Sequence, residues 1–173
     1  NLRRVKFYNP RKGIIAGEGG FIARTENRGL SWSIESSGVT ENLHSLSYSS
    51  AQRAWAVGQN GRVMRSTNGG RTWSAQTSNT TRRLKSIHMQ RGTNRGVAVG
   101  AEGRVIKTTD GGETWTEQTV SGGSVQDLND VNFVNSTVGW AVGNGGTIMR
   151  TTDGGATWSG SNPVSADLQA VAF

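Results

Sequence analysis

A unit of about 40 residues occurs four times in this 173-residue chain, and this repetition restricts the fold more than any other feature. Each copy opens with a short run that has apolar residues at its first, fourth and sixth places. The runs begin at Leu2, Leu43, Leu84, Leu128 and Leu168, so their starts differ by 41, 41, 44 and 40 residues. Such a period is typical of repeat architectures, in which each unit buries its apolar face against the next.

Two further apolar runs follow in each copy, separated by glycines. In the last copy they are 140–142 and 148–149, with Gly143 and Gly146 between them. Glycine accepts the positive φ that tight hairpin turns require, so this pattern predicts two short antiparallel strands joined by a turn.

An octapeptide that ends in Trp comes next, at 25–32, 66–73, 108–115 and 151–158, and its Trp residues are 41, 42 and 43 apart. Its Asn or Asp can accept hydrogen bonds from turn amides, and its Trp can pack the turn onto the sheet. These predicted structural residues are Asn27, Trp32, Asn68, Trp73, Asp110, Trp115, Asp153 and Trp158. One carboxylate per turn is too few for calcium, which takes 6–8 oxygens.

A fourth strand is expected after each of these Trp residues. Four antiparallel strands per copy, with no helical periodicity, predict an all-β fold: a β-propeller of four-stranded blades, with about four blades and one extra strand at 168–173. We expect a single domain over 1–173, with repeats at 2–42, 43–83, 84–127 and 128–167. The sequence leaves open a compact four-bladed ring, a fragment of a larger ring, or copies that self-associate to share blades.

Composition excludes several classes of function. The chain has no Cys, so disulfides, iron–sulfur clusters and thiol catalysis are excluded, and no apolar run approaches the roughly 20 residues of a membrane span. His44 and His88 lack other ligand-type residues at a usable spacing, so we expect no metal and no cofactor. A sialidase-like site would need a Tyr nucleophile, but Tyr8 and Tyr48 are the only tyrosines, and Tyr48 occupies an apolar strand place. We therefore expect no catalysis.

Positive charge is concentrated in the first three copies. Residues 1–107 hold 18 cations and five carboxylates, a net +13, whereas residues 108–173 hold one cation and seven carboxylates, a net −6. First strands line the channel of a propeller, and their polar places, with the residues just before them, predict a partner-binding surface: Arg3, Arg4, Lys6, His44, Arg82, Arg83, Lys85 and His88. The alternative interpretation is an ordinary solvated surface. A second basic group, expected in loops on the opposite face, contains Arg11, Lys12, Arg53, Arg91 and Arg95. Nucleic acid is disfavoured as a partner, because the aromatic residues belong to the core and turns.

The octapeptide resembles the Asp-box, or bacterial neuraminidase repeat, of sialidases and sortilin-type receptors. The longer pattern at 139–158, Gly-Trp-Ala-Val-Gly-Asn-Gly-Gly-Thr-Ile-Met-Arg-Thr-Thr-Asp-Gly-Gly-Ala-Thr-Trp, is most similar to the photosystem II assembly and stability factor family, whose propellers have seven blades. The resemblance implies a non-catalytic scaffold that binds a protein partner with an acidic segment, located in the thylakoid lumen or the periplasm. The alternatives are a propeller that binds an anionic glycan or serves as a phage structural protein and, less favoured, a glycoside hydrolase.

Overall fold

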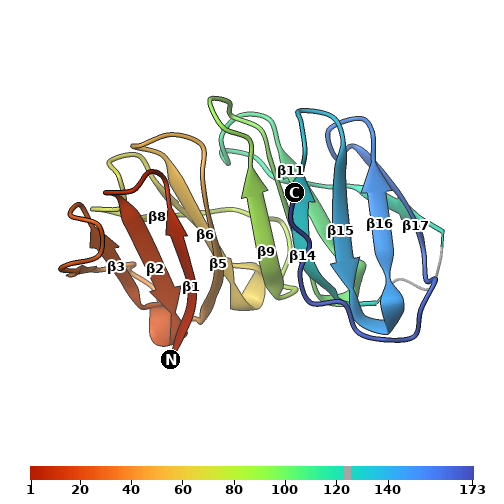
Figure 1. The fold of residues 1–173 in the computed structure, drawn as a ribbon, viewed down its shortest axis with the longest axis horizontal. Coiled ribbons are helices and arrows are strands. Elements are labelled where there is room, and N and C mark those ends of the chain that lie inside the picture. The colour runs from red at the N-terminus through yellow and green to blue at the C-terminus, as the bar shows by residue number, and fades with distance from the viewer. Residues whose placement is uncertain (123–125) are drawn as a thin grey trace.

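The computed structural model describes residues 1–122 and 126–173, and it confirms an all-β chain of Asp-box blades. Three sheets have four antiparallel strands in chain order, and a fourth sheet has five strands (Figure 1). We number these sheets blades 1 to 4. Blade 1 contains β1 (Leu2–Phe7), β2 (Gly13–Gly17), β3 (Ile22–Thr25) and β4 (Ser33–Glu35), and blade 2 contains β5 (Leu43–Tyr48), β6 (Ala54–Gly58), β7 (Val63–Ser66) and β8 (Ser74–Gln76).

The other two blades follow the same plan, with one addition. Blade 3 contains β9 (Leu84–Met89), β10 (Gly96–Gly100), β11 (Val105–Thr108) and β12 (Thr116–Glu117), and blade 4 contains β14 (Leu128–Phe133), β15 (Gly139–Gly143), β16 (Ile148–Thr151) and β17 (Thr157–Ser161). The sequence did not predict β13 (Thr119–Ser121), which pairs in parallel with β17 at the outer edge of blade 4. We call β1, β5, β9 and β14 the inner strands.

A short 3-10 turn joins the second and third strands of each blade, and glycine is required there. In blade 2 the turn is Gln59–Gly61, and Gly61 has a φ of 67°. A Cβ at Gly61 would lie 1.8 Å from the carbonyl oxygen of Thr80, so a side chain would displace the next segment of backbone. The glycine-ended turns of the sequence therefore also bring each blade close to the connection that leads to the next one.

The apolar core is divided into three clusters, each between neighbouring blades. Ile14 and Ile22 of blade 1 pack with Leu43 and Leu46 of blade 2, and all four are at most 2% exposed. A second cluster joins blades 2 and 3 around Trp55 and Trp115, and a third joins blades 3 and 4 around Val97, Phe133 and Trp158. The inner strands of blades 2 to 4, which are β5, β9 and β14, bury their first, fourth and sixth residues, as the repeat pattern requires. These residues include Tyr48, which the sequence placed in the core.

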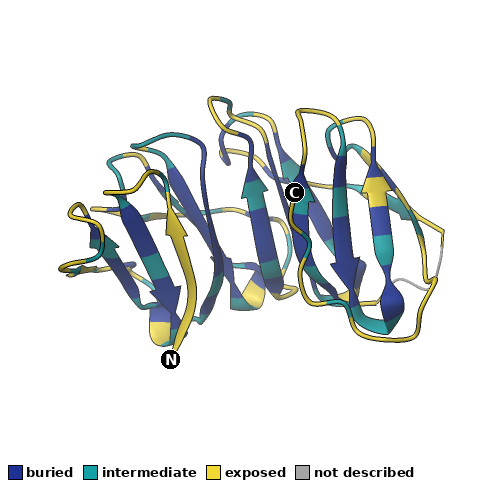
Figure 2. Ribbon diagram, in the orientation of Figure 1, coloured by how far each residue is buried: buried dark blue, intermediate teal, exposed yellow. Residues whose placement is uncertain are grey.

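The blades form an open arc. Blades 1 and 4 lie at opposite ends of the molecule (Figure 1), and all six residues of β1 are exposed, shown as a yellow strand in Figure 2. Among the described residues, no cluster of buried apolar side chains joins blade 1 to blade 4. The structure therefore differs from the compact four-bladed ring that the sequence left open.

The segment 168–173 does not form the extra strand predicted for it. It nevertheless lies beside β14, where the inner strand of a following blade would be. The amide of Leu168 donates to the carbonyl of Gly143 at 3.0 Å, and the Phe173 ring contacts Trp140 with the ring centroids 4.9 Å apart. Side chains of β14 take up further backbone groups of the segment, since Asn129 donates to the Leu168 carbonyl at 2.8 Å. These bonds replace the regular ladder of a strand pair.

Candidate functional site

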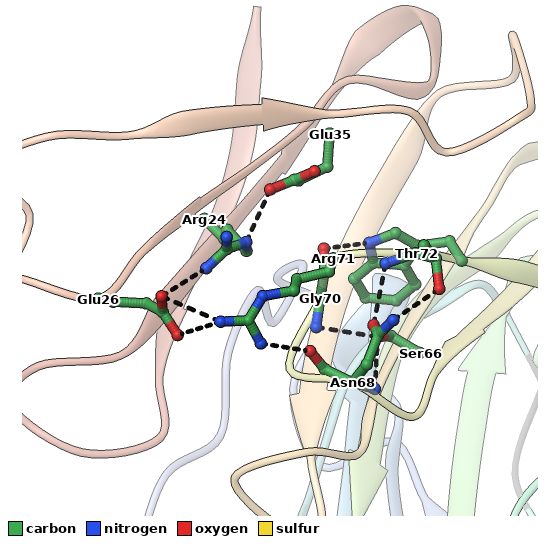
Figure 3. A network of polar contacts seen from close by, with 9 residues as sticks. Arg24, Glu26, Glu35, Ser66, Asn68, Gly70, Arg71 and Thr72 are labelled. Atoms are coloured by element: carbon green, nitrogen blue, oxygen red, sulfur yellow. Dashed lines mark hydrogen bonds and ion pairs between the residues drawn. The ribbon is translucent and has the colours of Figure 1, made fainter.

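The polar side chains of the Asp-boxes form hydrogen bonds within their own turns. In blade 2 the Asn68 side chain accepts from the amide of Thr72 at 2.9 Å and donates to its hydroxyl at 2.8 Å (Figure 3). Ser66 Oγ accepts from the amide of Gly70 at 2.9 Å, and the indole of Trp73 donates to the Gly70 carbonyl at 3.0 Å. These bonds satisfy the polar groups of the turn and fix the Trp against the neighbouring blade.

The carboxylates of the third and fourth boxes have the same role. The Thr114 hydroxyl donates to Asp110 at 2.5 Å, and with the Thr114 amide it holds the pKa of Asp110 well below its usual range. Asp153 accepts equivalent bonds from Thr157, which hold its pKa low although burial acts in the opposite direction. These side chains are ionised hydrogen-bond acceptors committed to their own loops.

Ion pairs near the boxes join the first two blades. Arg24 contacts both Glu26, at 3.0 Å, and Glu35, at 2.7 Å, and Arg71 of the second box contacts Glu26 at 3.0 Å (Figure 3). The Arg24 side chain is 15% exposed, so this pair is less screened by solvent than an ordinary surface pair. The network fixes how the second turn meets blade 1.

The inner strands carry most of the predicted partner-binding residues, and the structure divides them between two hollows. The lower hollow, near the start of each inner strand, has a volume of about 370 Å³ and is lined by Arg3, His44, Arg83, Lys85, Asn129 and Gln169. These residues come from all four repeats and from the segment 168–173. The structure therefore brings together four of the eight residues that the sequence nominated.

Carboxylates on adjacent segments neutralise much of the charge at the lower hollow. Arg3 pairs with Glu18 at 2.5 Å, and Lys85 and Arg83 pair with Asp127 at 2.8 and 3.4 Å. Hydrogen bonds from the N-terminal amine and Arg3 lower the pKa of Glu18, and the bond from Lys85 lowers that of Asp127. Burial and the nearby Arg3 lower the pKa of His44, so it is neutral at pH 7. The sequence analysis missed both carboxylates as partners of these cations.

The upper hollow lies toward the other end of the inner strands and has a volume of about 270 Å³. Its lining includes three nominated residues, Arg4, Lys6 and His88, together with Arg91 and Tyr8, which were not nominated. Burial, with the charge of Lys6, lowers the pKa of His88 to about 4, so this side chain is also neutral at pH 7.

Arg82, the eighth nominated residue, lies outside both hollows. It lines a groove between blades 2 and 3 with Arg104 and Glu117, and its guanidinium pairs with Glu102 at 2.7 Å. Arg91 could have been found from the sequence, because it follows the last residue of an inner strand by two places and belongs to the basic loop group. Nothing in the sequence indicated that Tyr8 would lie beside Arg91.

In 1–122 and 126–173 there is no group of three or more His, Asp or Glu side chains placed to hold a metal ion. No helix in the part of the chain that the structure describes has the length and apolar character of a membrane span.

Four-stranded blades, Asp-box turns and inner strands that line shared hollows define an Asp-box β-propeller. The family model described as "Photosynthesis system II assembly factor YCF48" matches residues 25–122, more than half of the chain. The chain belongs to this family. No curated protein matches the sequence significantly.

Solved structures show the same fold at low sequence identity. "YCF48 bound to D1 peptide" has a TM-score of 0.74 and 18% identity, covering 95% of this chain and 54% of that chain. "YCF48 from Cyanidioschyzon merolae" has a TM-score of 0.72 and 20% identity, covering 100% of this chain and 63% of that one. An ancestral GH74 enzyme has a TM-score of 0.75 and 20% identity, covering 91% of this chain and 23% of that one. The chain thus spans between half and two thirds of the length of these two YCF48 chains.

Proposed function

We propose that this chain is a non-catalytic scaffold in photosystem II assembly that binds a protein partner through the basic surface of its inner strands. Membership of the family is the observation that carries the proposal. The solved YCF48 with a D1 peptide makes that peptide the first partner to test. We therefore also propose that the chain is located in the thylakoid lumen or the periplasm, as expected for a family with this function.

The charge distribution supports an acidic segment as the part of the partner that is bound. Seven of the eight nominated residues lie in the two hollows of the inner strands, and most of them are cations. Opposite charges across an interface accelerate encounter and select the partner. The proposal therefore also predicts that binding weakens as salt concentration rises.

The arrangement of carboxylates supports a non-catalytic role. Glycoside hydrolysis uses two carboxyl groups, one of them a proton donor, on either side of the bond that breaks. Asp127, at the lower hollow, is bound to Lys85 and Arg83, and Asp130, at the upper hollow, accepts from the Ser86 hydroxyl at 2.6 Å. Both carboxylates are engaged within the protein. Binding of an anionic glycan and self-association to complete a ring stay as alternatives for the same basic surface.

A capture experiment tests the proposed function. The wild-type chain and the double variant Arg3→Gln/Arg83→Gln are immobilised, and binding of the D1 peptide is measured at low and at physiological salt. We expect capture by the wild type that falls at least tenfold in the variant. Arg150→Gln is the matched control, because Arg150 is the one cation in 108–173 and does not line either hollow. Equal capture by both variants would remove the lower hollow from the proposed surface, and no capture by the wild type would remove the peptide.

A further inference from the structure

The upper hollow combines a positive charge that is not neutralised with a fixed geometry. Arg4 and Lys6 line it from β1, and neither makes an ion pair with a carboxylate in 1–122 or 126–173. This distinguishes it from the lower hollow, where Arg3, Arg83 and Lys85 have carboxylate partners. Because Arg4 and Lys6 have no ion-pair partner among the described residues, an anion from outside would gain more there than at the lower hollow.

Arg91 is held in place at the wall of this hollow. Its guanidinium carbon lies 4.7 Å from the centroid of the Tyr8 ring, and Nη2 donates to the Tyr8 carbonyl oxygen at 2.8 Å. Stacking on an aromatic ring and one hydrogen bond orient the planar group, and its other N–H groups are left to bind an acceptor. The contact joins segments 83 residues apart, so the fold itself positions this cation.

The opposite wall carries a buried carboxylate. Asp130 is 8% exposed; its Oδ1 accepts from the Ser86 hydroxyl at 2.6 Å, and its Oδ2 accepts from the Val171 amide at 3.1 Å. A carboxylate in the same hollow repels every anion, and it repels a phosphate dianion or a polyanion more than a single carboxylate because their charge is larger. It also accepts hydrogen bonds from peptide N–H groups. The hollow thus has a cationic side and an acceptor side.

We propose that the upper hollow is an anchor site for one acidic side chain of a bound polypeptide. The side-chain carboxylate contacts Arg91, Arg4 and Lys6, and backbone N–H groups on either side of it face Asp130. A volume of about 270 Å³ is enough for a single side chain and its flanking backbone. This inference rests on the proposed function, which supplies a polypeptide partner, and it adds the chemistry that the partner must present.

The site contains its own reporter, His88. It is neutral at pH 7 with a pKa of about 4, lowered by burial and by Lys6, and it faces Asn132 and the Phe133 ring as well as the hollow. A carboxylate bound nearby favours the protonated imidazole, so occupancy should raise the pKa of His88. NMR of the His ring signals measures this shift at one residue.

The test uses the full chain and short peptides with acetylated and amidated ends, so that side chains alone carry charge. The peptide Ala-Ala-Glu-Ala-Ala is compared with its Gln counterpart, with the Gln peptide bearing a free C-terminal carboxylate, with inorganic phosphate and with a single-stranded oligonucleotide. We expect the Glu peptide to raise the His88 pKa by about one, and the amidated Gln peptide and phosphate to leave it unchanged. A shift as large with phosphate or the oligonucleotide would overturn the proposal, and a shift with only the free C-terminal carboxylate would replace the side chain by a chain terminus.

Two pairs of variants separate the anchor from general charge. Arg91→Met should weaken binding of the Glu peptide about tenfold, whereas Arg150→Met, which removes a cation outside both hollows, should leave it within twofold. Tyr8→Leu should weaken binding because Arg91 loses its ring, and Tyr8→Phe should restore it. Equal affinities for Arg91→Met and Arg150→Met would overturn the anchor. If the D1 peptide is captured equally by Arg91→Met and by the wild type, the anchor fails while the proposed function stands. If the Glu peptide binds and the D1 peptide does not, the anchor stands while the proposed partner fails.

Discussion

Blade 1 and blade 3 carry the same sequence pattern in different surroundings. Leu2 opens β1 and is 63% exposed, whereas Leu84 opens β9 and is fully buried. Trp32 of the first box lies partly exposed against Phe7, and Trp115 of the third box is fully buried beside blade 2. The comparison shows that the inner strand and the box Trp of a blade become fully buried where a preceding blade packs against them.

The largest expected effect is the difference in stability lost when Trp115 or Trp32, the Trp residues of the third and first boxes, is replaced. Trp115→Ala should lower the free energy of unfolding by about 3–5 kcal/mol, because it leaves a cavity in the interface of blades 2 and 3. Trp32→Ala should cost about 1 kcal/mol, since that side chain contacts mainly its own blade. Urea unfolding followed by circular dichroism measures both, and equal losses would contradict the comparison.

A second pair of variants tests the inner strands. Leu84→Ala should cost about 2–4 kcal/mol and Leu2→Ala less than about 0.5 kcal/mol, because burial of the apolar side chain is complete in one case and slight in the other. Differential scanning calorimetry of the two variants gives the shifts in Tm. A large shift for Leu2→Ala would show that β1 is covered in solution, and a dependence on protein concentration would identify a second copy as the cover.

The histidine of blade 3 should make stability depend on pH. The folded pKa of His88, about 4, lies below the ordinary value of 6.5, because burial and Lys6 disfavour the charged ring. The contribution of neutral His88 to the free energy of unfolding is therefore complete above pH 6.5. It is lost as the pH falls from 6.5 to about 4, because in this range the unfolded chain takes up a proton that the folded chain does not. His88→Gln should remove roughly 2 kcal/mol of this pH dependence. Unfolding curves at pH 7 and pH 4.5 measure this difference in the free energy of unfolding. The same difference in the wild type and in His88→Gln would refute the prediction.

The smallest effect concerns the boxes of blades 2 and 3, which differ in using Asn68 and Asp110 for the same turn. The Thr114 hydroxyl and amide hold the pKa of Asp110 below its ordinary value, so its contribution is present above pH about 4 and is lost as the pH falls toward the folded value. Because Asn68 makes the same bonds to Thr72 without a charge, Asp110→Asn should keep the turn bonds, change stability little at pH 7 and reduce acid sensitivity below pH about 4. Thermal unfolding at pH 7 and pH 3 measures this difference. A large loss at pH 7 would show that the charge itself is required.

The strands and boxes could be predicted because their causes are local. Alternating apolar places, glycine turns and a Trp at fixed spacing determine each hairpin, and they placed Tyr48 correctly in the core. The neighbours of the basic residues could not be predicted in this way. Glu18 meets Arg3 within the first hairpin of blade 1, at a point where the register of β1 and β2 shifts. Asp127 meets Arg83 across 44 residues, so this pair depends on how blade 4 packs against blade 3.

Two features of blade 4 also could not be predicted from the sequence. β13 pairs in parallel with a strand about 38 residues later, and the only sequence sign of it is the longer spacing of 44 in the third repeat. The segment 168–173 has the pattern of an inner strand, yet its backbone bonds go partly to side chains such as Asn129 and Asp130. The pattern marked this segment as an inner strand, but it did not predict that side chains of β14 would take up its backbone groups.

The division of the core into three separate clusters has a consequence for how the molecule opens. In arrays where each unit contacts its neighbours, stability is close to a sum of unit and interface terms, and unfolding proceeds from an end. Blades 1 and 4 each have one such interface and blades 2 and 3 have two, so backbone amides should exchange with solvent faster toward the ends of the arc than in its middle. The amides of β1 and β2 should exchange first and those of β6 and β10 last.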